Sequence, residues 1–208
     1  MTASSDHYFS ARPASSGERR SLHVHLAGRH LTVRTAPGVF CPERLDLGTR
    51  VLLEHVPDPP GTGTLLDLGC GWGPVALTLG LLSPDAEVWA VDVNERALDL
   101  TRENARAAGV ERLHAAPPED VPGDLVFEQI WSNPPIRVGK QVLHELLLTW
   151  LPRLAAGGTA YLVVQRNLGS DSLQKWLARE LDGRWPGDFE VSRHSSAKGF
   201  RVLQVDRR

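Results

Sequence analysis

A short apolar run that passes directly into alternating glycines limits the possible folds more than any other feature of this sequence. The run is Leu-Leu-Asp-Leu at 65–68, and Gly69, Gly71 and Gly73 follow at every second position. Glycine reaches positive φ at no steric cost and lets a ligand approach the backbone closely, while Pro74 favours the first turn of a helix. The pattern predicts a strand, a ligand-binding loop and a helix in direct succession.

An acidic residue at the end of the next apolar run indicates a nucleoside ligand. The segment 87–91 is followed by Asp92, Val93 and Asn94. A carboxylate about 20 residues after a glycine loop can accept hydrogen bonds from both ribose hydroxyls. A dinucleotide site is the competing interpretation, but the spacing Gly-x-Gly-x-Gly lacks the third glycine of that fingerprint. The spacing therefore favours a nucleoside without a pyrophosphate.

A third apolar segment, 127–132, ends in Asn133-Pro134-Pro135. Each proline fixes its own φ and keeps the residue before it out of the α region, so this turn is rigid and extended. At the carboxyl end of a strand in an open α/β sheet, such a turn directs carbonyl acceptors into the ligand crevice. Taken alone, the three residues are more typical of an ordinary turn that ends a strand.

Strand and helix patterns alternate along the chain, which predicts an α/β fold with a mainly parallel sheet covered by helices on both faces. Segments 22–26 and 31–35 alternate apolar and polar residues and predict a hairpin. Helices are expected over 45–54, 75–82, 95–108, 140–154 and 172–181, a fifth sheet strand over 159–164, and a terminal hairpin over 189–194 and 200–205. The expected organisation is a flexible segment (1–20), a hairpin with a short helix (21–60) and a main domain (61–208).

Composition restricts the partners and the compartment. A net charge of −2 over 208 residues gives no bulk attraction to nucleic acid. Arginines near both ends of the chain could form a local basic face, although ordinary solvated charges would explain them equally well. Cys41 and Cys70 are too few for a disulfide framework and are expected to be reduced. No segment resembles a membrane span or signal peptide, so a soluble, cytoplasmic protein is expected.

Metal binding is not expected. His23 and His25 lie two residues apart on a predicted strand and would share one face. No third ligand accompanies them in the sequence pattern, and we interpret both as solvated strand residues.

The glycine loop, Asp92 and Asn133-Pro134-Pro135, in this order, resemble the class I S-adenosylmethionine-dependent methyltransferases that act on planar or amide nitrogens. Further segments narrow the resemblance to single-domain relatives of the ribosomal small-subunit guanine-N2 methyltransferases; these segments are 7–10, 26–29, 37–40, 45–49 and 133–136. The resemblance covers nearly the whole chain. It implies a seven-stranded, mainly parallel, doubly wound Rossmann-like sheet with an antiparallel last strand, preceded by the small hairpin, and a methyltransferase domain over 61–208.

The resemblance implies S-adenosyl-L-methionine as the cofactor. Asp92 would bind the ribose, the glycines would border the methionine end, and Asp67 would orient the loop or meet the ammonium group through water. Phe40 and Thr49 would close the pocket. The implied cofactor-binding set is Phe40, Thr49, Asp67, Gly69, Cys70, Gly71, Gly73, Asp92, Val93 and Asn133.

Asn133, Pro134 and Pro135 would form the catalytic set. The lone pair of an exocyclic amine is delocalised into the purine ring, so the amine must pyramidalise before it attacks a methyl group. The side-chain oxygen of Asn133 and the backbone carbonyl of Pro134 would accept both N–H bonds and so localise the lone pair. This chemistry requires no metal.

Two positions depart from the pattern of enzymes that act on a flipped base. Ile136 stands where an aromatic residue usually stacks on the base, so Phe40 or Trp131 would have to supply the stacking, unless Ile136 is simply a core contact. Ala115 and Ala116 cannot hydrogen-bond the adenine amino group through their side chains. Backbone groups or Glu119 would have to do so.

Methylation of guanine N2 in ribosomal RNA, on free RNA or on a ribosomal subunit, is the leading hypothesis. Its substrate-binding residues would be Ile136, Arg137, Lys140 and Lys198, with Arg201 in the same patch. The alternatives are N-methylation of a protein amide or a small amine, methylation of DNA adenine, and a cofactor-binding RNA module without catalysis. The sequence does not predict the oligomeric state.

Overall fold

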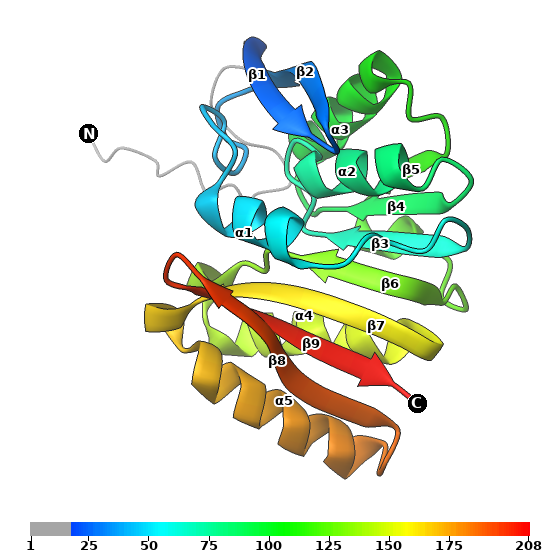
Figure 1. The fold of residues 1–208 in the computed structure, drawn as a ribbon, viewed down its shortest axis with the longest axis vertical. Coiled ribbons are helices and arrows are strands. Elements are labelled where there is room, and N and C mark those ends of the chain that lie inside the picture. The colour runs from blue at the N-terminus through cyan, green and yellow to red at the C-terminus, as the bar shows by residue number, and fades with distance from the viewer. Residues whose placement is uncertain (1–17) are drawn as a thin grey trace.

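The computed structural model describes residues 18–208, and its centre is a seven-stranded sheet in the order β5-β4-β3-β6-β7-β9-β8. The strands are β3 (Thr64–Leu68), β4 (Glu87–Val91), β5 (Leu113–Ala116), β6 (Phe127–Ser132), β7 (Leu154–Gln165), β8 (Phe189–Ala197) and β9 (Phe200–Arg207). Neighbours from β5 to β7 pair in parallel, and β9 runs antiparallel to both β7 and β8. The expected antiparallel last strand is confirmed, and Figure 1 shows the strands in this order down the molecule.

Helices cover both faces of this sheet, as predicted for a doubly wound fold. One face carries α1 (Leu47–His55), α2 (Pro74–Leu82) and α3 (Glu95–Ala108), and the other carries α4 (Lys140–Trp150) and α5 (Ser170–Arg184). Four short 3₁₀ turns complete the chain: η1 (Pro118–Asp120), η2 (Ile136–Val138), η3 (Leu151–Arg153) and η4 (Arg166–Leu168). Each helix buries an apolar face against the sheet, and this burial is the main source of its stability.

Strand order reverses at β3, because the chain proceeds from β3 to β4 and β5 and then returns to place β6 on the opposite side of β3. In open α/β sheets, ligands bind outside the carboxyl ends of the strands at such a reversal. The glycine loop follows β3 and the Asn-Pro-Pro turn follows β6. The topology therefore places these two sequence motifs at one edge of the sheet.

A two-stranded hairpin, β1 (Arg20–Leu26) and β2 (Arg29–Thr35), lies against α2 and α3 at one end of the molecule (Figure 1). Its buried side chains pack in one cluster with Leu77 of α2 and Leu100 of α3. This cover explains why α2 is buried nearly all round instead of presenting a polar face. His23 and His25 are exposed, as expected for solvated strand residues.

The predicted helix over 140–154 was wrong at its C-terminal end. α4 ends at Trp150, residues 151–153 form the turn η3, and Leu154 already begins β7. Pro152 causes the change, because its ring disfavours a helical residue before it and it has no N–H to continue the helix. The expected strand over 159–164 is accordingly longer. The predictions for 1–17, including the motif at 7–10, lie outside the described residues.

Candidate active site

A cavity of about 330 Å³ opens at the carboxyl ends of β3, β4 and β6. Its volume falls within the range typical of small-molecule sites. Nine predicted site residues line it: Phe40, Gly69, Asp92, Val93, Asn133, Pro134, Pro135, Ile136 and Arg137. The walls between them are mostly apolar. The two sequence motifs and the strand-end carboxylate thus share one cavity, as the topology requires.

Asp92 is the acidic group on the β4 side of this cavity. Its Oδ2 accepts a hydrogen bond from the Gly71 amide at 2.9 Å, and its Oδ1 accepts one from the Asn94 amide at 2.9 Å. Burial raises the pKa of Asp92 above its ordinary value, while the backbone N–H donors oppose this rise. A carboxylate has about four lone-pair sites, so Asp92 keeps acceptor capacity beside these backbone donors. Asp92 can therefore bind a diol while the glycine loop holds its orientation.

The glycine loop is attached to β4 by its own backbone. The amides of Gly69 and Cys70 both donate to the carbonyl of Val91, at 2.8 and 3.0 Å. Gly73 has a φ of +92°, and a Cβ there would lie 2.9 Å from Thr101 Oγ1. A side chain at Gly73 would thus be strained and would press against α3. Of the four predicted loop positions 69, 70, 71 and 73, Gly69 lines the cavity, and the others support the loop.

Asp67 lies beneath this loop and does not line the cavity. Its Oδ2 accepts a hydrogen bond from the Ala76 amide in the first turn of α2 at 2.9 Å. Complete burial, helped by the nearby charge of Asp92, raises the pKa of Asp67 to about 8 against the opposing effect of the Ala76 hydrogen bond. Of the two roles expected for Asp67, these contacts match orientation of the loop.

Asn133 has a fixed amide orientation. Its Nδ2 donates to Asp46 Oδ2 at 2.9 Å and to Thr49 Oγ1 at 3.0 Å. An ionised carboxylate only accepts hydrogen bonds, so the atom that faces Asp46 must be the nitrogen of the Asn133 amide. Both hydrogens of the Asn133 amide are therefore bonded to residues at the start of α1, Asp46 and Thr49. The amide oxygen, Oδ1, is left to accept a bond from a ligand in the cavity.

The proline turn supplies a second acceptor. Pro135 has φ −75° and ψ 76°, which is an inverse γ-turn, and the Ile136 amide donates to the Pro134 carbonyl at 2.8 Å. A carbonyl oxygen has two lone pairs, so this carbonyl keeps one for a ligand. The side chain of Ile136 lines the cavity and also packs against the core. Ile136 can thus be both a substrate-binding residue and a core contact.

Asp46 is a site residue that the sequence analysis did not identify. It lines the cavity and also caps α1, because the Thr49 amide donates to its Oδ2 at 3.1 Å. The sequence could have predicted the capping role, because aspartate is a preferred N-cap and Asp46 stands three residues before Thr49. It could not have predicted the contact with Asn133. Thr49 does not line the cavity, but its hydroxyl accepts a hydrogen bond from Asn133, which does.

Several aromatic and polar predictions need correction or extension. Trp131 is 1% exposed, its indole N–H donates to Gln129, and it does not line the cavity, so its proposed stacking on a base was wrong. Phe40 does line the cavity, joined by Phe200 of β9. Near the expected adenine position the lining residue is Pro118, not Glu119. Further lining residues missed by the sequence analysis are Leu68, Val91, Leu146, Gln165 and Leu168.

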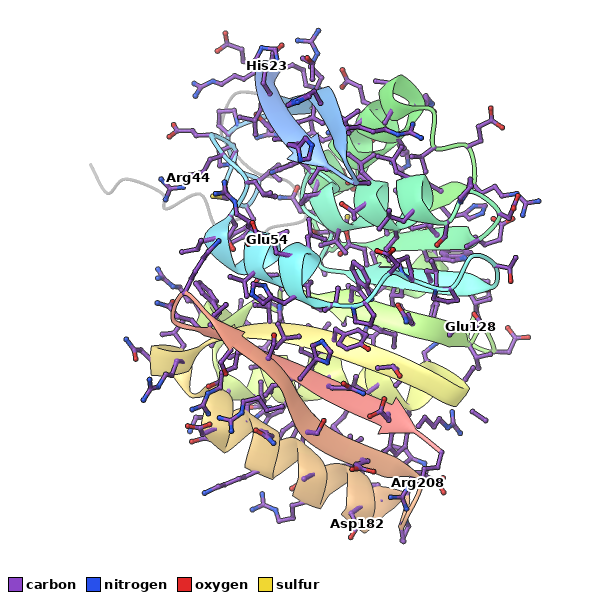
Figure 2. The ribbon with its side chains drawn as sticks, viewed as in Figure 1. His23, Arg44, Glu54, Glu128, Asp182 and Arg208 are labelled. Carbon is purple, nitrogen blue, oxygen red and sulfur yellow. The ribbon has the colours of Figure 1, made fainter. Side chains whose placement is uncertain are left out.

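The four expected basic residues occupy different surroundings. Arg137 is exposed and lines the cavity, and Lys140 is exposed at the start of α4 but does not line it. Lys198, in the turn between β8 and β9, forms an ion pair with Glu54 of α1 at 2.9 Å (Glu54 is labelled in Figure 2). Arg201 is paired with Asp171, and its side chain is only 12% exposed. Arg201 is therefore not an exposed strand residue.

Among the described residues, no group of three or more histidine, cysteine or acidic side chains could hold a metal ion. Cys41 and Cys70 are both free thiols, and burial raises the pKa of Cys70. Within 18–208, no helix is long and apolar enough to cross a bilayer. The cytoplasmic location stays a prediction.

Two proteins are similar in sequence to this chain over most of its length. A protein of Bacillus subtilis, YbxB, is 31% identical over 204 residues, which are 97% of this chain and 98% of that protein. The ribosomal RNA large subunit methyltransferase G of Pseudomonas paraeruginosa is 37% identical over 159 residues, or 73% of this chain. This chain matches only 42% of the length of that enzyme.

A solved structure shares the architecture. A T. thermophilus 16S rRNA N2 methyltransferase, in complex with AdoMet and guanosine, superimposes with a TM-score of 0.73 at 25% identity and covers 91% of this chain and 51% of its own. The model of the Methyltransferase small domain family matches residues 30–193. The glycine loop, Asp92 and the Asn-Pro-Pro turn all lie inside this match. The chain therefore belongs to the Methyltransferase small domain family and is an S-adenosylmethionine-dependent methyltransferase.

Proposed function

We propose that this enzyme methylates ribosomal RNA, on the exocyclic N2 amine of a guanine that is flipped out of its stack. The observation that carries the proposal is the orientation of Asn133, whose amide oxygen is the group left to face the cavity because its nitrogen is bonded to Asp46 and Thr49. Names of two relatives support the substrate class, since both are ribosomal RNA methyltransferases. Ribosomal RNA, free or within a subunit, is thus the proposed partner.

The residues present fit the cofactor. Asp92 offers oxygen acceptors for the ribose, and Gly69 has no atom within 4 Å of where a Cβ would stand, which leaves room for the methionine end. Val93, 41% exposed on the cavity wall, offers an apolar contact for the adenine. S-adenosylmethionine supplies an electrophilic methyl group on a sulfonium sulfur.

Asn133 and Pro134 act on the attacking amine. Asn133 Oδ1 and the Pro134 carbonyl accept its two N–H bonds, so the nitrogen lone pair is turned out of the ring plane toward the methyl group. As the N–C bond forms, the nitrogen gains positive charge and then releases one proton to solvent. Both acceptors, with the carboxylate of Asp46 behind Asn133, stabilise that charge where it develops.

A planar base would find apolar walls on the far side of the turn. Phe40 is 39% exposed and lines the cavity, and Phe200, Ile136 and Leu168 complete this part of it. Phenyl rings provide stacking that the aliphatic Ile136 does not. Phe40 and Phe200 are therefore the proposed stacking residues, in place of the aromatic residue absent at 136.

Ile136 also favours one alternative, N-methylation of a protein amide. A glutamine amide has the same planar –NH₂ group and needs acceptors for both N–H bonds, but it does not need an aromatic partner. The aliphatic surface of Ile136 suits an extended peptide as well as a base. The acceptor pair at Asn133 and Pro134 would perform the same chemistry on either substrate.

Transfer of labelled methyl groups distinguishes these substrates. Purified enzyme and labelled S-adenosylmethionine are incubated with RNA, DNA and protein fractions from cells that lack the enzyme, with the Asn133→Ala variant as the inactive control. We expect label in ribosomal RNA, recovered as N2-methylguanosine after nuclease digestion. Label confined to protein, or to a small molecule, would replace RNA as the proposed substrate.

A further inference from the structure

A second cavity, of about 360 Å³, lies beside the turn that joins β8 and β9. Its lining contains four cationic side chains, Arg166, Arg193, Lys198 and Arg201, together with Ser196, Ala197, Gly199 and Phe200. Phe200 also lines the candidate active site, so the two cavities share a wall. We call this second cavity the arginine groove.

The arginine groove carries a net positive charge. Lys198 is neutralised by Glu54, and Arg201 by Asp171. Arg166 and Arg193 are exposed, and neither forms an ion pair with any carboxylate of residues 18–208. Four cations and two paired carboxylates leave a charge of +2 on a molecule whose net charge is −2. Unpaired arginines concentrated in one cavity attract an anion.

Backbone contacts join the groove to the active site. Gln165, at the end of β7, lines the active-site cavity, and the next residue, Arg166, lines the groove. Adjacent Cα atoms lie about 3.8 Å apart. The Arg166 amide donates to the Gly199 carbonyl at 2.9 Å, which holds this corner against the β8–β9 turn. The groove therefore lies directly beside the active-site cavity, on the side of Gln165 and Phe200.

We infer that the arginine groove binds phosphate groups of the RNA strand next to the target nucleotide, through Arg166 and Arg193. This inference rests on the proposed RNA substrate and adds the place where the neighbouring backbone lies. A flipped base remains attached to its strand, so the flanking phosphates must leave the cavity along its rim. Guanidinium groups donate two parallel hydrogen bonds to phosphate oxygens, which suits them to this contact.

The groove favours a nucleic acid over an acidic protein segment for two reasons. It adjoins a cavity whose Phe40 and Phe200 walls suit a planar base. The groove also offers cations and a serine hydroxyl at its edge but few apolar side chains, whereas stable protein interfaces have an apolar centre. Phosphate groups pair with arginine side chains without needing such a centre.

The test compares three double variants of the full chain. Arg166→Gln with Arg193→Gln removes the two unpaired charges, and Arg166→Lys with Arg193→Lys keeps charge but removes the guanidinium forks. Arg179→Gln with Arg184→Gln is the matched control, because it removes two exposed arginines from the far half of α5, near Asp182 in Figure 2. At about 1.5 Å per residue, Arg179 and Arg184 lie about 14 and about 21 Å along α5 from its first residue, Ser170.

Binding is measured by fluorescence anisotropy with a labelled single-stranded RNA of mixed sequence, over a series of KCl concentrations. For the glutamine pair we expect an RNA affinity about tenfold lower at 0.1 M KCl. The slope of log affinity against log salt concentration should become shallower by about 1.4, because each lost phosphate contact to a single strand removes about 0.7 from the slope. The lysine pair should retain most of the salt slope. The control pair should match the wild type, and all variants should bind S-adenosylmethionine normally.

Three outcomes would overturn the inference. One is an unchanged salt slope for the glutamine pair when the wild type binds and methylates RNA. Another is an equal loss in the control pair, since the effect would then be bulk charge. The third is a loss of methyl transfer into a protein fraction with transfer into RNA unchanged. If the wild type neither binds nor methylates RNA, the proposed function itself is wrong, which separates that failure from failure of the groove.

Discussion

The side-chain amide of Asn133 donates to Asp46 across 2.9 Å, although the two residues lie 87 positions apart in the chain. Asp46 also caps α1 through the Thr49 amide. The first turn of α1 and the proline turn after β6 are thus held by one carboxylate oxygen. The orientation of the proposed catalytic amide therefore depends on the position of α1, which packs against β7 and β9.

Removal of the Asn133 amide should separate binding from chemistry. We expect Asn133→Ala to lower the rate of methyl transfer at least about 100-fold, because loss of one preorganised partner of the transition state costs about 3 kcal/mol. Affinity for S-adenosylmethionine should stay within about twofold. Single-turnover transfer and calorimetry measure the two quantities, and a variant with the wild-type transfer rate would limit Asn133 to forming the turn.

Thr49→Val tests whether the amide must be held. Valine keeps the shape of threonine but removes the oxygen that accepts from Asn133 Nδ2 at 3.0 Å. We expect the transfer rate to fall about fivefold, equivalent to about 1 kcal/mol for one hydrogen bond, with cofactor affinity unchanged. Thr49→Ser is the matched control because it restores the hydroxyl, and it should recover most of the rate. Equal rates in the valine and serine variants would contradict this role.

Asp92→Ala should weaken both cofactor binding and the fold. Loss of the ribose acceptor should reduce affinity for S-adenosylmethionine by about 1–3 kcal/mol. The same change leaves the amides of Gly71 and Asn94 without their carboxylate partner, so the melting temperature should fall as well. Calorimetry on the folded variant, well below its melting temperature, isolates the binding effect. Unchanged affinity there would remove Asp92 from the cofactor site.

Asp67 should make stability depend on pH. Its pKa is raised to about 8 in the folded protein from about 3.9 in the unfolded chain, so between these values the folded state binds a proton that the unfolded state does not. The stability from this group is complete below pH 4 and is lost as pH rises through about 8. The slope for one proton is at most about 1.4 kcal/mol per pH unit.

Asp67→Asn provides the comparison, because its amide oxygen can still accept from Ala76 while the side chain never ionises. Urea unfolding of both proteins should show the wild type losing stability relative to the variant between pH 5 and pH 8. Parallel curves for the two proteins would mean that Asp67 keeps an ordinary pKa in the folded state.

Local sequence determined the parts of the site that depend on one segment each. The glycine loop, Asp92 and the Asn-Pro-Pro turn were predictable because each follows an apolar strand. Parallel strands bring their carboxyl ends to one edge, so the convergence of the three was predictable too. The same local signals placed α3, with Asn94 as its N-cap and Gly109 ending it at a φ of +73°. Capping groups and backbone constraints act within a few residues, and a sequence displays them directly.

Tertiary structure alone decided which distant side chains meet. Phe200 reaches the cavity because β9 pairs with β7, and Lys198 meets Glu54 across 144 positions of the chain. Trp131 points into the core rather than the cavity because of the face it occupies on β6. Such contacts are set by strand register and helix packing, which sum many weak interactions over the whole molecule, so no local pattern encodes them.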